Sequence, residues 1–456
     1  MGTCMTLDQE GIKIVRLLKN RGFSGFFVAG FVRDKLLKRQ SDNLDIATDA
    51  QPEMVQKILR ANKFYTREIG KKYGTILAAT KAGPIEITTF RSEGDYADKR
   101  RPTTVTFIKD YQTDAKRRDF TVNSLYFEPL SKKLLDPVNG LKDLKAKLLR
   151  FVGDPKKRID EDHLRMLRAV RLATRLNFRL EKNTFAAIKT RAKLIQDVSG
   201  ERIKAELDKI LASGKPAEGL RLLDKIGLLQ FIIPEAEALK LFSHQSKKYH
   251  LEGSIWDHTL LAIHKARKEN LVLLYALIFH DMGKPDRAKE VLKEEGWVIS
   301  TKGHADVSAD IFFGFAKRIK FGRHDRNDIE WLIRNHMLMF DFFNMGFRKQ
   351  LKLAATSVFP LLLKHWCYDE AATKRSVYRD NHHARFLKSL RLGHGLLQRL
   401  NRLEPLIKKL ANGDLIMRYT NLKPGRRLGE EKEKIKALIV LGKIKSQQDL
   451  KNHLLA

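Results

Sequence analysis

The sequence predicts an α+β protein in which a small sheet-bearing head precedes a long helical body. Short runs of β-branched and aromatic residues, bounded by Gly, Pro or Asp, are confined to the region before residue 130. From about residue 140 onward, apolar residues recur almost everywhere at helical spacing. At 456 residues the chain is too long for one small core, so we expect two or more domains.

The head is expected to combine strands and helices. Strands are predicted in GFFVAG (25–30), NLDIAT (43–48), GTILAAT (74–80) and PIEITTF (84–90). Helices are predicted between them in FVRDKLLKR (31–39) and QPEMVQKILRANK (51–63), whose apolar residues recur at helical spacing.

The body is expected to be helical throughout. One amphipathic helix is predicted over DEDHLRMLRAVRLATRL (160–176), opened by Asp160 as its N-cap, and helices follow at 200–213 and 216–232. A histidine-rich helical block runs from about 245 to 375. The remainder is basic and helical, with shorter patterns and a turn at NLKPGRRLG (421–429).

The charge balance favours a polyanionic partner. The chain has 88 Lys and Arg against 54 Asp and Glu, a net charge of +34, and a pI near 10.0. Solubility alone needs an excess of only about 2–8 charges on a small domain. The excess therefore indicates binding to RNA or DNA.

Composition also excludes several classes of protein. The two cysteines, Cys4 and Cys367, cannot build a disulfide framework or a cysteine-rich zinc site, so we expect a reducing, cytoplasmic location. No run of about 18 apolar residues is present, and the start lacks the apolar core of a signal peptide, so we expect no membrane partner. The sequence leaves the oligomeric state open.

The turn between the first strand and helix is a candidate phosphate site. Gly30 lies where the strand ends, Arg33 follows one helical turn later, and Asp34 is placed to orient Arg33. On the next strand, residues 43 and 45 share one face because side chains alternate. Asp45 is a candidate Mg²⁺ ligand there, and Glu86 is a candidate second carboxylate from a neighbouring strand.

Five segments occur in an order and spacing that resemble the class II nucleotidyltransferases. They are VAGFVRD…NLDIATDA, YGTILA, IEITTFR…YADKRRP, RRDFTVNSLYF and DEDHLRMLRAVR. This family of the DNA polymerase β superfamily comprises tRNA CCA-adding enzymes and bacterial poly(A) polymerases. The resemblance is strong over residues 22–240 and weaker in LANGDLIMRYTNLKPGRRLG…LGKIKSQQDL near the end.

The resemblance implies a mixed-sheet nucleotidyltransferase head followed by a helical neck and body. The implied activity is Mg²⁺-dependent addition of nucleotides from CTP and ATP to a tRNA 3′ end without a template. By the same resemblance, Gly30, Arg33 and Arg118 contact the nucleotide, and Asp119 and Asn123 lie by its ribose.

Asp162 and Arg165 are implied to read the base. On the predicted helix they are three residues apart and share a face. A carboxylate accepts from the amino group of C or A and a guanidinium donates to the adjacent ring acceptor, whereas U and G present the opposite arrangement. Arg168 and Arg171 extend the basic stripe along the same face.

The chain departs from the family pattern at two positions. The usual Gly–Gly pair is Ala29–Gly30 here, which is a mild change if the phosphate lies over Gly30. The first carboxylate of the metal pair is replaced by Asn43. An amide oxygen binds a hard cation without contributing charge, so we expect weaker metal binding. Asp42 is the alternative ligand only if it lies in a loop that can reach inward.

The histidine-rich block resembles the HD phosphohydrolase domain. A His–Asp pair beside Gly–Lys–Pro occurs among four other candidate ligands, and the set is His258, His280, Asp281, His304, His336 and Asp369. Imidazole and carboxylate ligands suit a divalent transition metal or Mg²⁺. We expect His258, His280, Asp281 and Asp369 to be the innermost ligands, with His304 and His336 able to hold a second ion.

These observations predict four regions: a head at 1–135, a nucleobase- and RNA-binding neck at 136–240, an HD domain at 241–375 and a basic tail at 376–456. The leading functional hypothesis is a CCA-adding tRNA nucleotidyltransferase. The alternatives are a poly(A) polymerase, an enzyme that adds only CC or only A, an HD phosphohydrolase acting on RNA ends with a weakened head, and an RNA-binding protein without activity.

Overall fold

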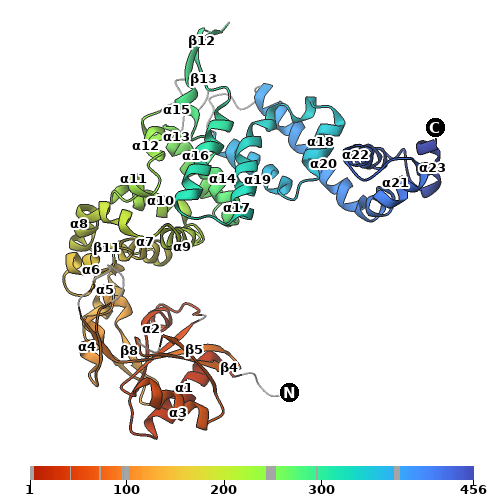
Figure 1. The fold of residues 1–456 in the computed structure, drawn as a ribbon. Helices are drawn as coiled ribbons and strands as arrows, with labels where there is room; N and C mark the ends of the chain where they lie inside the picture. The colour runs from red at the N-terminus through yellow and green to blue at the C-terminus, as the bar shows by residue number, and fades with distance from the viewer. Residues whose placement is uncertain are drawn as a thin grey trace. The chain divides into compact units, whose positions relative to one another are not determined.

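The computed structural model describes residues 5–41, 43–70, 73–94, 96, 102–242, 253–293, 296–373 and 381–455. The chain divides into two compact units, Met1–Ile232 and Ile233–Ala456 (Figure 1). The first unit contains the sheet and a set of helices, and the second is helical apart from one hairpin.

The head is built on a seven-stranded mixed sheet with the order β3-β4-β5-β2-β1-β8-β9. Its strands are β1 (Gly25–Val28), β2 (Leu44–Thr48), β3 (Tyr65–Gly70), β4 (Thr75–Thr80), β5 (Gly83–Thr89), β8 (Tyr126–Glu128) and β9 (Lys133–Leu135). The β2–β5 pair is parallel and the other pairs are antiparallel. A separate pair is formed by β6 (Arg91–Glu93) and β7 (Val105–Phe107). The predicted strands correspond to β1, β2, β4 and β5.

The two faces of this sheet have different surroundings. Helices α1 (Leu7–Lys19) and α3 (Pro52–Ala61) pack together on one face (Figure 1), where Gly11 of α1 lies against Phe27 and Leu44. The other face carries an apolar cluster that includes Phe26, Val28 and Ala47, together with Ala115 of α4 (Tyr111–Lys116). Since Asp45 pairs with Val28 in register, its side chain belongs to this second face.

Helix α2 (Ala29–Leu36) follows β1 directly, and the rest of the first unit is mostly helical. Its remaining elements are η2 (Thr121–Asn123), α5 (Gly140–Lys145), β10 (Leu148–Leu149), α6 (Pro155–Glu161), α7 (Arg165–Leu176), β11 (Arg179–Leu180), α8 (Lys182–Arg191), η3 (Ala192–Asp197), α9 (Gly200–Leu211), α10 (Pro216–Lys225) and α11 (Leu229–Ile232). The predicted helix over 216–232 is divided at Gly227, whose φ of +77° ends α10.

The single helix predicted over 160–176 is wrong. Asp160 lies inside α6, whose N-cap is Asp154, and α7 begins only at Arg165. Asp162 separates the two helices with an extended backbone (φ −148°, ψ 105°). Its carboxylate accepts the Leu164 N–H at 3.2 Å, a local bond that competes with continuation of the helix.

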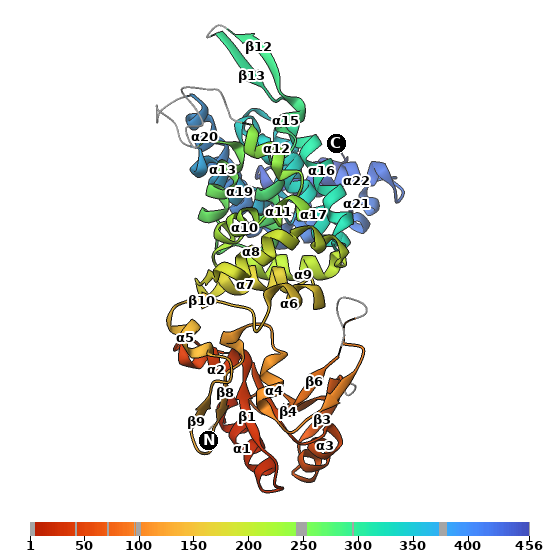
Figure 2. The same ribbon diagram turned by 90° about the vertical axis from the view of Figure 1, so that its left-hand side faces the viewer.

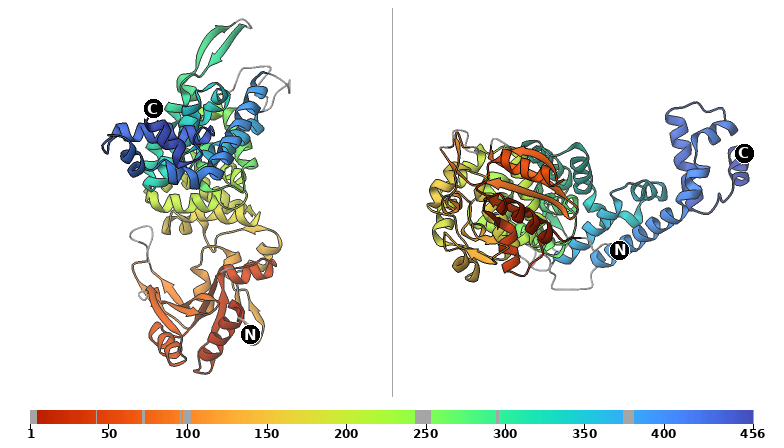
Figure 3. Two further views of the ribbon diagram at one scale, coloured as in Figure 1. Left: turned by 90° about the vertical axis from the view of Figure 1, so that its right-hand side faces the viewer. Right: turned by 90° about the horizontal axis from the view of Figure 1, so that it is seen from below.

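The second unit packs helices around α14 (Leu271–Phe279), a nearly fully buried helix. Its other elements are α12 (Ala236–Leu241), α13 (Ile255–Lys265), α15 (Lys284–Arg287), β12 (Lys289–Lys293), β13 (Gly296–Ser300), α16 (His304–Arg318), α17 (Arg323–Asn335), η4 (His336–Phe340), η5 (Phe342–Asn344), α18 (Phe347–Ala354) and α19 (Phe359–Ala372). The β12–β13 hairpin projects away from these helices (Figures 2 and 3). No helix among the described residues combines the length and apolarity that crossing a bilayer demands.

The basic tail contains one long helix, contrary to the short patterns expected there. Helix α20 (Asn381–Leu410) has 30 residues and retains Pro405 in its interior. It packs with α21 (Gly413–Tyr419), α22 (Arg426–Val440) and α23 (Gln447–Leu455) around an apolar cluster that includes Leu410, Ile416 and Ile435. Leu403, Leu406, Ile407 and Leu410 of α20 belong to this cluster or pack against it, so tertiary packing stabilises the last turns of the helix.

Candidate functional sites

The turn between β1 and α2 has an unusual backbone. Ala29 adopts a φ of +57°, in the left-handed region that a residue with a Cβ occupies at a cost of roughly 1–2 kcal/mol. The Ala in place of the usual Gly is therefore a strained substitution rather than a neutral one. At Gly30, a Cβ would lie 3.4 Å from the Arg33 Nη2 atom, so this position is close-packed against the guanidinium.

Arg33 is buried and fully engaged within the head. Its Nε donates to Asp34 Oδ1 at 2.8 Å, its Nη2 lies 2.7 Å from the same oxygen, and its Nη1 donates to Asn123 Oδ1 at 2.6 Å. Burial lowers the pKa of Arg33, partly offset by the Asp34 carboxylate. Asp34 thus contacts Arg33 as expected, and Arg33 ties the β1–α2 turn to Asn123.

Asp45 and Glu86 are neighbours across the parallel β2–β5 pair. Burial, followed by repulsion from Glu86, raises the pKa of Asp45 from 3.8 to about 6, and Arg118 partly opposes this. Asn43 is exposed and lies immediately before β2. Asp42, the alternative ligand, lies outside the described residues. Two adjacent carboxylates that are costly to ionise together form a site suited to a hard cation.

A pocket of about 400 Å³ lies beside this part of the head. It is lined by Ala29, Tyr73, Arg91, Glu93, Tyr96, Pro102, Arg117, Arg118, Asp119, Asn123, Asp162, Arg165 and Arg168. Five of these residues are arginines and three are carboxylates, so the lining carries net positive charge that suits a triphosphate. The volume is in the range of small-molecule sites.

The pocket collects six of the residues expected to bind nucleotide and adds others that the sequence did not single out. Tyr96 donates to Glu93, and the Arg165 guanidinium lies 5.8 Å from the centre of the Tyr96 ring. Arg117 is ion-paired with Asp114 at 2.7 Å. Arg117 and Tyr96 stand inside the motifs RRDFTVN and YADKRRP, so the motifs themselves were the available signal.

Arg118 is held by a buried network. It donates to the Tyr126 hydroxyl at 2.9 Å and to Asp114 Oδ2 at 3.1 Å. Burial alone would lower the pKa of Arg118, but Tyr126 and Asp114 outweigh it and raise the pKa. Arg118 is therefore a permanently charged group with a set position in the pocket wall.

The proposed base-reading pair is brought to the pocket by the break between α6 and α7, not by one helix face. Each residue has a partner that orients it. Both Asp162 oxygens lie within 3.2 Å of Arg202 Nη2, and Arg165 bonds to Glu161. Arg168 also reaches the pocket, with its Nη2 2.5 Å from Asp119 Oδ2.

Arg171 is not among the pocket residues. Its Nε lies 3.0 Å from Glu206 Oε2, which pairs α7 with α9. Gly30, Arg33 and Asp34 likewise do not line the pocket, although Ala29 and Asn123 connect them to it.

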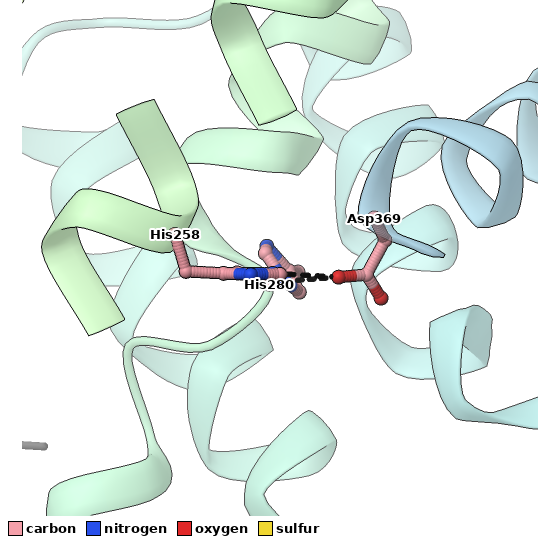
Figure 4. A group of neighbouring side chains, drawn as sticks. All are labelled: His258, His280 and Asp369. Atoms are coloured by element: carbon pink, nitrogen blue, oxygen red, sulfur yellow. Dashed lines mark hydrogen bonds and ion pairs between the residues drawn. The ribbon is translucent and has the colours of Figure 1, made fainter. Parts of the chain in front are cut away.

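In the second unit, six buried side chains form two groups that can each hold a metal ion. One group is His258, His280 and Asp369, and the other is Asp281, His304 and His336. In the first, His258 Nε2 lies 2.8 Å and His280 Nε2 3.5 Å from Asp369 Oδ1 (Figure 4). We call these six residues the metal centre.

Asp281 lies between the two groups. Its Oδ2 is 3.3 Å from His280 Nε2, whereas its Oδ1 is 3.3 Å from His304 Nε2. Asp281 therefore lies beside His280 of the first group, with which it was expected, and also beside His304 of the second group. Such an arrangement is typical of a carboxylate shared by two metal ions.

Three of the four histidines of the metal centre are oriented by the backbone. Nδ1 of His280, His304 and His336 bonds to the carbonyl oxygen three residues earlier, at 2.9, 3.0 and 2.7 Å. A ring that donates from Nδ1 keeps its Nε2 lone pair for a ligand. Each of these three rings is thus oriented with Nε2 toward the other ligands, where a metal ion would replace any proton on that atom.

The buried carboxylates of the metal centre hold a positive charge beside them. Burial would lower the pKa of His280, but Asp281 and Asp369 raise it to about 10. Among the described residues, the buried His280 Nε2 makes no hydrogen bond of good geometry, although Asp281 Oδ2 and Asp369 Oδ1 lie 3.3 and 3.5 Å from it. Deprotonated imidazoles and carboxylates with free lone pairs fit a divalent metal, which competes with the proton on His280.

Two further residues of this region were not predicted as site residues. Lys284 Nζ lies 2.7 Å from Asp281 Oδ2. His365 is fully buried in α19, and burial followed by the charge of His280 lowers its pKa to about 3, so its ring is neutral. Its position four residues before Asp369 was the available signal.

Comparison with known proteins finds three families along the chain. The poly A polymerase head domain matches residues 25–150, the probable RNA and SrmB-binding site of polymerase A matches 177–240, and the HD domain matches 250–371. CCA-adding enzymes match the same chain: that of Geobacillus stearothermophilus is 40% identical over 224 residues. The chain therefore combines a poly A polymerase head domain with an HD domain.

The extent of these matches is partial for the curated relatives. The G. stearothermophilus match covers 49% of this chain and 54% of the relative. The CCA-adding enzyme of Streptococcus sanguinis is 37% identical over 261 residues, which is 56% of this chain and 64% of the relative. The chain thus spans about half of the length of several curated relatives it matches.

Solved structures show the same fold along nearly the whole chain. The Bacillus stearothermophilus CCA-adding enzyme in complex with CTP has a TM-score of 0.68 at 24% identity, covering 99% of this chain and 98% of the other. The Thermotoga maritima CCA-adding enzyme complexed with tRNA has a TM-score of 0.59 at 18% identity, covering 98% and 94%. The predicted α+β fold with a mixed sheet in the head is confirmed.

Proposed function

We propose that this nucleotidyltransferase adds C and A to the 3′ end of tRNA from CTP and ATP, without a template and with release of pyrophosphate. The observation that carries the proposal is the arginine-lined pocket, in which Asp162 and Arg165 meet beside Arg118. Relatives named as CCA-adding enzymes support the choice of substrate. The four predicted regions, 1–135, 136–240, 241–375 and 376–456, belong to the same proposal, as does a cytoplasmic location with the tRNA.

In the reaction, the tRNA 3′-hydroxyl attacks the α-phosphate of the bound nucleotide. Arg118, held by Tyr126 and Asp114, places fixed positive charge beside the phosphates. Asp45 and Glu86, with the amide oxygen of Asn43, would hold Mg²⁺, which neutralises charge on the triphosphate when bound. The raised pKa of Asp45 makes this site sensitive to pH near 6.

Base choice follows from the hydrogen-bonding groups of the pocket. The Asp162 carboxylate accepts from the exocyclic amino group of C or A, and Arg165 donates to the neighbouring ring acceptor. Arg202 and Glu161 hold these two side chains in place before the nucleotide binds. Because U and G present the reverse pattern of donors and acceptors, they leave buried polar groups unpaired and are rejected.

The test supplies purified protein with tRNA that lacks its 3′ CCA, Mg²⁺ and labelled CTP, ATP or both. We expect incorporation of C from CTP alone and completion with A when both are present, and no incorporation with the Asp45→Asn variant. Long A tracts from ATP alone would identify a poly(A) polymerase instead, and products that stop at CC or accept only A would identify the partial activities.

A second candidate function is a phosphohydrolase activity of the metal centre on RNA ends. The specific observation is that Asp281 faces both groups of metal-binding side chains, with Lys284 2.7 Å away to contribute positive charge. Hydrolysis of a 2′,3′-cyclic phosphate by the parent, lost when His280 and Asp281 are replaced by Ala, is the expected result. Equal hydrolysis by both proteins would contradict it.

A further inference from the structure

His365 is a buried histidine beside the metal centre and is not one of its six residues. Its side chain is 0% exposed, and it lies on the same face of α19 as Asp369, one helical turn earlier. Its ring centre lies 5.1 Å from that of His280 and 5.7 Å from that of His336. It therefore contacts one histidine from each of the two groups.

The His365 ring lacks the well-formed backbone bond that three of the other histidines have. His280, His304 and His336 each use Nδ1 on a carbonyl oxygen, whereas neither nitrogen of His365 has a hydrogen-bond partner within the described ranges. The Ala276 carbonyl oxygen is the backbone acceptor beside the ring and raises the pKa of His365. The same oxygen already accepts the main-chain N–H of His280 at 2.9 Å. Even a bond there would satisfy one nitrogen and leave the other without a partner.

A neutral imidazole carries one donor and one acceptor, and burying either unpaired is unfavourable. Structures keep such a group when something other than protein side chains pairs with it, typically an ion or ordered solvent. Between His280 and His336, the partner we expect is the metal ion of the metal centre or the solvent bound to it.

We infer that His365 is a seventh polar residue of the metal centre, whose free ring nitrogen is paired by the bound metal or by solvent that the metal holds. The inference rests on the proposed metal centre. With His365, five imidazoles face two carboxylates, a donor set that favours a divalent transition metal over Mg²⁺.

The test uses Co²⁺ as the probe, because its absorption spectrum reports on its ligands. Co²⁺ affinity, the Co²⁺ spectrum and the melting temperature with and without Co²⁺ are measured for the full chain and for His365→Leu and His365→Gln. The control is Leu363→Ala on the same helix, a buried residue whose side chain lies against Gly393 of α20.

We expect His365→Leu to weaken Co²⁺ binding by about 10- to 100-fold, the usual loss when a residue supporting a metal is removed. The metal-free variant should melt at the same temperature as the parent or higher, because an unpaired buried group has been replaced by an apolar one. His365→Gln should retain part of the affinity. Leu363→Ala should lower the melting temperature equally with and without Co²⁺ and leave the affinity unchanged.

A changed spectrum in His365→Leu would identify a direct ligand, and weaker binding with an unchanged spectrum would identify pairing through solvent; both support the inference. Unchanged affinity and spectrum in both His365 variants, with equal melting shifts in the two states, would overturn it. If the parent bound no Co²⁺, both the metal centre and the role of His365 would be refuted. If the parent bound Co²⁺, and His280→Ala abolished this binding while His365→Leu left it unchanged, only the role of His365 would be refuted.

Discussion

Replacing Asn43 by aspartate adds a carboxylate immediately before β2, two residues from Asp45. Side chains alternate along a strand, so residue 43 continues the face that carries Asp45 and, across the parallel pair, Glu86. Asp45 already resists ionisation, with a pKa of about 6 caused by burial and by Glu86. The new charge should raise this pKa further without a cation and strengthen Mg²⁺ binding when the cation is present.

The size of the effect follows from the strand geometry. Two residues along a strand are about 6.6 Å apart, and two unit charges at that distance interact by roughly 2.5 kcal/mol at an effective dielectric constant of about 20. The binding free energy of a divalent cation between the carboxylates should improve by at least a comparable amount. Asn43 is exposed, so solvent screening removes part of it. A surviving ~1.4 kcal/mol corresponds to a tenfold change, and we expect tenfold or more.

The assay is single-turnover addition of C to tRNA lacking its 3′ end, measured across a Mg²⁺ titration. Asn43→Asp should raise the rate of addition or lower the Mg²⁺ concentration for half-maximal rate by that factor. The matched control is Gln40→Glu, which adds the same charge at an exposed position of the loop preceding β2. The control should change neither quantity.

An Asn43→Asp variant with the same rate and the same Mg²⁺ dependence as the parent would refute this prediction. Residue 43 would then not be a metal ligand, and Asp42 would become the better candidate. Equal gains from Asn43→Asp and Gln40→Glu would also refute it, because they would show a general charge effect rather than a ligand.

Four further outcomes are expected. Asp45→Asn should abolish addition. It should also stabilise the metal-free protein by about 3 kcal/mol above pH 6 but not below pH 4, since a folded pKa raised from 3.8 to about 6 costs the parent stability as pH rises through that window. A pH-independent difference in denaturant unfolding would contradict the shift. Asp162→Ala should remove discrimination of C and A from U and G, a loss on the order of 1–3 kcal/mol per base; unchanged selectivity would exclude Asp162 as a base reader. Binding to tRNA should weaken steeply as the salt concentration rises, because the net charge is +34; a flat response would contradict this. Truncation after residue 376 should weaken tRNA binding more than nucleotide binding, and equal losses of both would contradict that expectation. Replacing both His280 and Asp281 by Ala should remove bound transition metal and leave nucleotide addition nearly intact, and unchanged metal content by elemental analysis would refute the metal centre.

Local features of the sequence were sufficient for the main elements of the head. Alternation and flanking Gly or Pro predicted strands that the structure places at Gly25–Val28, Leu44–Thr48, Thr75–Thr80 and Gly83–Thr89. The order of motifs, through resemblance to a family, predicted the pocket residues and the candidate metal ligands. Composition and spacing alone did not assign those roles.

The same local reasoning failed between residues 160 and 176. The apolar period continues through Asp162, so the pattern predicts one helix, whereas the side chain of Asp162 bonds to the Leu164 N–H and to Arg202, forty residues later. The spacing of apolar residues carries no information about a hydrogen-bond partner that lies forty residues later in the chain.

Tertiary structure alone decided how the sites are assembled. Parallel pairing of β2 with β5 places Glu86 beside Asp45, and the fold of the second unit sets Asp281 between two groups of ligands with His365 against both. The sequence by itself determined which side chains were available, because backbone preference and hydrophobic period act over a few residues. Which of them meet, and which remain buried without a partner, depends on contacts between segments far apart in the chain, and those form only when the apolar faces pack.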